Sequence, residues 1–186
     1  MSEQAERVWE QLQALAERVL EHPKDLEPRD PIRLYGSLWR LWHYPAFAPH
    51  TTWTVLKPGR KAPAGAPALV REVSWDMPRD NQRVFNLDFA DGGKTDPRPA
   101  IRVRDAQLPA EELRRLAEVG TALAVPLLAS VRAADADEDL FGLETYEVSP
   151  FVRVQWRGDG PLPWRHFLDW VGELRAFLRR HLEQAG

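Results

Sequence analysis

The sequence has no cysteine, and this absence excludes a disulfide framework, a thiol nucleophile and a thiolate metal site. It also has no long apolar run: the longest, residues 122–131, is too short to span a bilayer and contains Pro126. The N-terminal residues lack the apolar stretch of a signal peptide, because Glu3 and Glu6 stand where it would begin. We therefore expect a soluble, cytoplasmic protein that does not bind membranes.

The sequence has no strong excess of charge of one sign. Its 25 Lys and Arg residues and 28 Asp and Glu residues give a net charge of −3 at pH 7. This balance gives no global electrostatic attraction toward nucleic acid. We therefore expect no nucleic-acid partner.

Catalytic motifs are lacking as well. The chain has no G-x-S-x-G nucleophile turn, no H-E-x-x-H and no pair of histidines at metal-ligand spacing. The acidic stretch 135–139 lacks the glycine and the terminal glutamate of a calcium-binding loop. We predict no catalytic residue, no metal site and no cofactor, and an enzyme is the less favoured class.

Proline and tryptophan, in contrast, are abundant, with 16 and eight residues in a chain of 186. Many prolines imply fixed loops, and many tryptophans imply a core or a binding surface built from large rings. The content of 44% hydrophobic and 28% charged residues is typical of a globular protein. The length predicts a single domain over residues 1–186.

The last part of the chain, residues 141–186, predicts two strands followed by a closing amphipathic helix. In the second strand Val152, Val154 and Trp156 alternate with polar residues. The helix then shows apolar residues at the spacing of one helical face. These residues are Trp164, Phe167, Leu168, Val171, Leu174, Phe177, Leu178 and Leu182.

The same segment resembles a group of small uncharacterised bacterial proteins. The quoted order is GLETYE, then a short strand, then VQWRGDGPLPW, then a helix with a further tryptophan. It is similar to a GL-x-x-YE strand and a W-x-G-x-GP-x-x-W turn that precede a closing amphipathic helix in that group. The resemblance covers the last quarter of the chain and implies a bacterial protein. It implies no functional residue, because the group has no assigned activity.

The first part of the chain predicts a helical hairpin over residues 3–43. Residues 3–21 have a helical apolar face and end at His22-Pro23. Asp30-Pro31 is typical of a helix start, and apolar residues up to Trp42 then predict a second helix.

The middle of the chain predicts a strand meander over residues 51–106, followed by a short helix over 108–120. Four runs have strand patterns and are separated by residues typical of loops: 51–57, 68–76, 83–90 and 100–105. Residues 121–131 fit no single element. The expected fold class is therefore α+β, with an antiparallel sheet of about five to six strands. We expect the N-terminal helical hairpin and the C-terminal helix to pack on one face of that sheet.

Residues 39–53 form the densest aromatic stretch, and it contains the candidate ligand-binding residues Trp42, His43, His50 and Trp53. These side chains could line a stacking pocket for a planar ligand or a sugar ring, with a histidine as the polar contact. They could equally form the packing of the second helix on the first strand. Aromatic residues at helical spacing are usually core residues, which favours the second interpretation.

Arg102, Arg104 and Arg153 are the candidate partner-binding residues. Each alternates with apolar residues in a predicted strand, so we expect all three on one polar face of the sheet. This face could recognise an anionic group or a protein partner. The alternative, a solvated face of cross-strand ion pairs, is the commoner arrangement.

Two functional hypotheses follow from the sequence. The favoured hypothesis is a non-catalytic protein-binding module of a bacterial cytosol, either an adaptor or an immunity-type protein that blocks its partner. The alternative is a small-ligand-binding or enzymatic pocket in residues 39–53.

Overall fold

We analysed a computed structural model of the whole chain, and the structure describes residues 2–26, 32–87, 98–123, 137–146 and 152–186. Within this part of the chain, no helix combines the length and apolar character that crossing a bilayer requires.

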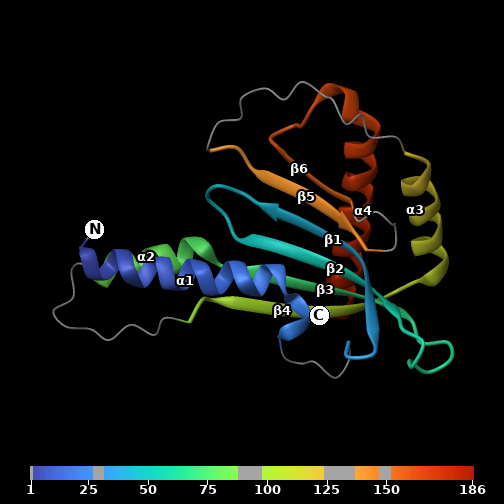
Figure 1. Cartoon of the computed structure of the whole chain (residues 1–186), viewed down its shortest axis with the longest axis horizontal. Helices are drawn as coiled ribbons and strands as arrows, with labels where there is room; N and C mark the ends of the chain where they lie inside the picture. Colours follow the sequence, from blue (N-terminus) through green and yellow to red (C-terminus); the bar gives the residue numbers. More distant parts are fainter. Residues whose placement is uncertain (1, 27–31, 88–97, 124–136, 147–151) are drawn as a thin grey trace.

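The centre of the fold is a six-stranded sheet in which every neighbouring pair is antiparallel (Figure 1). The strand order is β4-β3-β2-β1-β5-β6, so β1 and β2 occupy the middle. This arrangement confirms the predicted α+β class and the antiparallel sheet. The strands are β1 (Tyr35–Tyr44), β2 (His50–Pro58), β3 (Ala68–Trp75), β4 (Ile101–Leu108), β5 (Leu140–Thr145) and β6 (Val152–Arg157).

Helices cover both faces of the sheet, and the prediction that they group on one face is wrong. α4 packs on one face through the main core cluster, whereas α1 packs on the opposite face against Val73 and Trp75 of β3. Residues on both faces of the central strands are therefore buried, and sequence alternation alone could not show which side faces a helix. The α-helices within the described residues are α1 (Glu3–Glu21), α2 (Met77–Leu87), α3 (Ala110–Ala122) and α4 (Arg165–Ala185).

The predicted second helix of the N-terminal hairpin is a strand, so that prediction is wrong. Its residues form most of β1, in which Leu41 faces α4 and Trp42 faces the other side. Apolar residues three apart fit one face of a helix. A strand that is buried on both faces has apolar residues at successive positions, so it can show the same spacing. The helix that pairs with α1 is instead α2, and Figure 1 shows the two side by side at one end of the sheet.

The predicted strand over residues 83–90 is also wrong, because residues up to Leu87 belong to helix α2. The carboxylate of Asp76 accepts a hydrogen bond from the backbone N–H of Arg79 at 3.2 Å, and Pro78 stands in the first turn. Both are helix-start features that the alternation of residues 84–87 concealed. Val84 is buried against α1, and residues 88–90 lie outside the described part of the chain.

The remaining predicted elements are confirmed within a few residues at their ends. These are α1, β2, β3, β4, α3, β5, β6 and α4. Of the stretch 121–131 that fitted no single element, residues 121 and 122 end α3 and residues 124–131 lie outside the described residues.

The main core lies between α4 and the sheet and contains several large rings. Trp39 of β1 meets Trp170 of α4 edge to face, with ring centroids 5.8 Å apart. The indole N–H of Trp170 donates to the carbonyl of Leu116 in α3 at 3.0 Å. This hydrogen bond satisfies the polar atom of a buried ring and joins α3 to α4.

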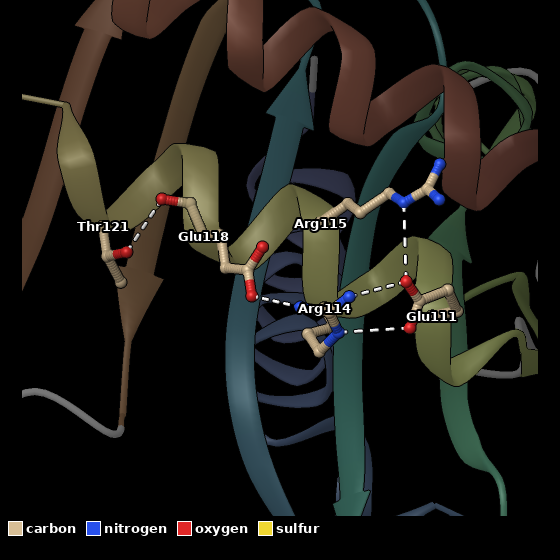
Figure 2. A network of polar contacts seen from close by, with 5 residues as sticks. All are labelled: Glu111, Arg114, Arg115, Glu118 and Thr121. Carbon is tan, nitrogen blue, oxygen red and sulfur yellow. Dashed lines mark hydrogen bonds and ion pairs between the residues drawn. The ribbon is translucent and has the colours of Figure 1, made fainter.

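The outer surface of α3 carries a network of ion pairs that Figure 2 shows. Arg114 pairs with Glu111 on one side and Glu118 on the other, and Arg115 reaches Glu111 at 3.6 Å. Because these side chains are exposed, each such pair contributes only ~0–1 kcal/mol to stability. The network is a solvated helix face in which each arginine has an acidic neighbour.

Replacing Leu174 tests the role of α4 as the cover of one sheet face. Leu174 is fully buried in the main core, so Leu174→Ala should lower the free energy of unfolding by roughly 2–5 kcal/mol. Urea denaturation followed by circular dichroism measures this change. Leu162→Ala, at an exposed leucine, is the control. A loss below about half a kcal/mol for Leu174→Ala would mean that α4 is peripheral.

Candidate functional site

The four candidate ligand-binding residues lie on two opposite faces of the sheet. Alternate residues of a strand point to opposite faces, and the pairing of β1 with β2 fixes which residues share a side. Trp42 and His50 lie on the face that α1 partly covers, whereas His43 and Trp53 lie on the face that α4 covers. The sequence-based prediction of one shared site therefore combined side chains that the fold places on opposite faces.

A groove of about 520 Å³ lies between α1 and the half of the sheet that α1 leaves uncovered. Trp42 and His50 line it, together with Arg153 of β6, which was predicted for a different, partner-binding surface. Its other aromatic residues are Trp9, Tyr44, Phe47 and Trp75. The groove thus combines a ring-lined centre with charged side chains, which is the usual composition of a recognition site.

Trp42 forms the centre of the sheet side of the groove. Its ring lies between two guanidinium groups, with the Cζ atom of Arg40 5.2 Å and that of Arg153 5.0 Å from the ring centroid. The ring also lies directly against Gly142 of β5, where a Cβ atom would overlap it. Only 2% of Trp42 is exposed. The ring is therefore a fixed support for the arginines, and its face is not free for a ligand to stack on.

Glu144 of β5 connects the charged groups beside Trp42. Its carboxylate accepts a hydrogen bond from Arg40 at 2.8 Å and lies 3.4 Å from the guanidinium of Arg153. The hydroxyl of Tyr146 donates to the same carboxylate at 2.7 Å. Burial and this hydrogen bond raise the pKa of Tyr146 to about 12. Since Arg153 is half-exposed and held at one end, its guanidinium is the cation of this cluster that a ligand can reach.

The opposite end of the groove is a stack of rings. Tyr44 stacks on His50 with centroids 5.0 Å apart, and His50 meets Trp75 edge to face at 5.3 Å. Burial lowers the pKa of His50, although a hydrogen bond with the carbonyl of Pro45 opposes this effect. Burial likewise raises the pKa of Tyr44. Both side chains therefore favour their neutral forms.

A second hollow of about 430 Å³ adjoins the groove at the loop between β1 and β2. The two hollows share Ala46, Phe47 and Met77, and the second extends to Phe85 on α2. Phe47 is 81% exposed and Phe85 is 54% exposed. Together the hollows form a long recess with two large apolar side chains open to solvent, which is unusual for a surface without a binding role.

The candidate partner-binding residues are also divided between the two faces. Arg102 and Arg104 of β4 lie on the α4 side, where Arg104 pairs with Glu72 at 2.7 Å, whereas Arg153 lies in the groove. The prediction that the three arginines share one face is wrong. The strand order places β4 and β6 at opposite edges of the sheet. The alternation of side chains along each strand does not show which face of one strand lies on the same side as which face of another.

Sequence reasoning missed several groove residues. Trp9 and Trp75 were assigned to no site, and Arg40 was hidden in the predicted helix, yet all three line the groove. Arg40 could have been noticed in the sequence, because it is a charged residue between the apolar residues Trp39 and Leu41. A charge in such a position needs a buried partner. Among the described residues, no group of three or more His, Asp or Glu side chains is placed to hold a metal ion.

The contact between Trp42 and Gly142 can be tested with a double-mutant cycle. Gly142→Ala places a methyl group where the Trp42 ring lies, so the free energy of unfolding should fall by about 1–3 kcal/mol. In a Trp42→Ala background the same change should have little effect, because the obstructing ring is gone. Urea denaturation of the four proteins measures the coupling. Equal losses in both backgrounds would contradict the described packing.

The lowered pKa of His50 predicts how stability depends on pH. Folding keeps His50 neutral at pH values where the unfolded chain already binds a proton, so the unfolded state binds more protons. The free energy of unfolding should therefore fall as the pH decreases below about 6.5, and this contribution ends below the folded-state pKa. Urea denaturation above and below this pH range measures the fall in the free energy of unfolding. This fall should be smaller for His50→Gln than for the wild type. Equal losses would mean that His50 is not linked to unfolding.

A comparison of this chain with protein-family models, with curated proteins and with solved structures found no match. The interpretation of the groove therefore depends on its own geometry.

Proposed function

We propose that this protein is a non-catalytic protein-binding module and that the groove, together with the adjoining hollow, receives an extended segment of a partner protein. The single observation that carries this proposal is the exposure of Phe47 and Phe85 along one continuous recess. Large rings that protrude beside a hollow are typical of the residues that dominate binding energy at protein interfaces.

The length of the recess supports a chain segment as the ligand. It extends from Arg157 at the β6 end, past the stacked rings, to Phe85 on α2. An extended segment would place successive side chains in the two hollows, with apolar groups near Phe47 and an acidic group near Arg153. Burial of such side chains provides affinity, and the charged contact provides orientation.

Two more specific roles remain within this proposal. An adaptor would hold two proteins together, and an immunity-type protein would block the partner that it binds. The setting of either role, a bacterial cytosol, is part of the proposal as well.

Photo-crosslinking from the recess tests the proposal directly. Replacing Phe47 with p-benzoylphenylalanine in cells should give a crosslinked protein of defined mass, and Phe85→Ala in the same chain should reduce its yield. The same probe at Val119, an exposed residue on α3, is the matched control and should give no such product. Identical products from both probe positions, or none from position 47, would contradict the proposal.

The alternative of a small-ligand site is favoured by one observation, the volume of the groove. About 520 Å³ lies within the usual range of roughly 300–1,000 Å³ for small-molecule sites. A metabolite panel followed by thermal unfolding distinguishes the two functions. A rise in melting temperature that Arg153→Gln abolishes and Phe47→Ala leaves intact would favour the small ligand.

A further inference from the structure

Four arginines gather on the face of the sheet opposite the groove, and we call them the arginine surface. Arg102 and Arg104 come from β4, and Arg175 and Arg179 come from α4, one helical turn apart. Residues four apart on a helix are neighbours on its surface.

A chain of contacts connects the arginines of the two elements. The guanidinium of Arg179 lies over the ring of Trp53, with its Cζ atom 5.5 Å from the centroid. The indole N–H of Trp53 donates to Glu72 at 2.9 Å, and Arg104 donates to the same carboxylate at 2.7 Å. Arg102 lies two residues from Arg104 and therefore on the same face.

The other end of the surface is also held on an aromatic ring. The Cζ atom of Arg175 lies 5.7 Å from the ring centroid of Phe141, and Phe141 stacks on His43 at 4.3 Å. His43 lies 2.8 Å from the carboxylate of Asp139. Burial, and then repulsion by Arg179, lower the pKa of Arg175, and attraction by Asp139 opposes these effects. The two helix arginines are thus close enough to oppose each other electrostatically.

The acidic groups at this surface are too few to neutralise the arginines. Glu72 pairs with Arg104, and Asp139, which lies 2.8 Å from His43, also attracts Arg175 electrostatically. Within the part of the chain that the structure describes, Arg102, Arg175 and Arg179 have no ion-pair partner. In contrast, Arg114 and Arg115 on α3 face Glu111 and Glu118 (Figure 2), and Arg180 of α4 faces Glu112 at 2.8 Å. Among the described residues, this surface therefore carries four arginines against the two carboxylates of Glu72 and Asp139.

The geometry suits carboxylate ligands. A guanidinium group that already rests on a ring loses little freedom when it binds, and its planar N–H groups match two carboxylate oxygens. Arg102 and Arg179 are exposed, so both are open to solvent. Trp53, in contrast, is only 1% exposed, so the surface offers no free indole face on which a nucleotide base could stack.

We propose that the arginine surface binds an acidic segment of a protein, a segment with several Asp or Glu residues in succession. This inference is independent of the proposed function, because the groove lies on the other side of the sheet. The net charge of −3 opposes binding of a long polyanion, whereas a short acidic segment needs only the local cations.

The test uses a fluorescein-labelled oligoglutamate peptide and measures fluorescence anisotropy with the full chain. We expect binding at low salt that weakens as salt is added, since exposed charges are screened. The double variant Arg175→Gln/Arg179→Gln should bind roughly tenfold or more weakly, as expected when charge-assisted hydrogen bonds are lost. The matched control is Arg114→Gln/Arg115→Gln, which removes the same charge from α3 and should bind like the wild type. Circular dichroism checks that both double variants are folded.

Three outcomes would overturn the proposal. The first is no binding of the peptide by the wild type at low salt. The second is equal weakening in the two double variants, which would show a response to net charge alone. The third is tighter binding of a labelled oligothymidylate with the same number of charges, which would indicate nucleic acid. Phe47→Ala should leave peptide binding unchanged, so a failure of the groove proposal remains distinguishable from a failure of this one.

Discussion

Two buried arginines hold the end of helix α1 and the residues that follow it against the sheet, and the position of the groove depends on them. Arg40 of β1 donates to the backbone carbonyl of Glu21 at 2.6 Å, and Arg71 of β3 donates to that of Leu26 at 2.9 Å. Each is also paired across the sheet, Arg40 with Glu144 and Arg71 with Asp105. Removing one partner of such a buried pair typically costs about 3–5 kcal/mol, because it leaves a charge without compensation. These contacts therefore fix where the helix ends and the open half of the sheet begins.

The same constraint leaves the two faces of the sheet covered in different ways. On one face α1 is tied over β3, so Trp42 and Arg153 remain at the base of an open groove. On the other face α4 buries the main core, and its arginines extend over the rings of Trp53 and Phe141. If both proposed surfaces bind, they would hold two segments on opposite sides of one sheet, which is the arrangement that an adaptor needs.

Part of the candidate site was accessible from the sequence. The aromatic stretch 39–53 was recognised as the place where a site could lie, and Trp42, His50 and Arg153 are in the groove. The sequence could not show which residues share one site. Residues adjacent in a strand point to opposite faces, and the residues of one groove come from distant strands. Trp9 and Trp75 illustrate the second difficulty: they are 66 positions apart by their numbers, yet their ring centroids are 5.9 Å apart.

The sequence by itself determined the elements whose patterns have a single interpretation. The amphipathic faces of α1, α3 and α4 and the alternation of the confirmed strands depend on local periodicity, which is written in neighbouring residues. Only the tertiary structure decided that β1 is a strand and α2 is a helix. The apolar spacing in β1 also fits a helix, because β1 is buried on both sides. The alternating residues at the end of α2 also fit a strand, although the residues before them start a helix. The tertiary structure also decided which face each side chain occupies. Face and register are set by long-range pairing and by the buried charges that need each other, and neither can be read from a period of two.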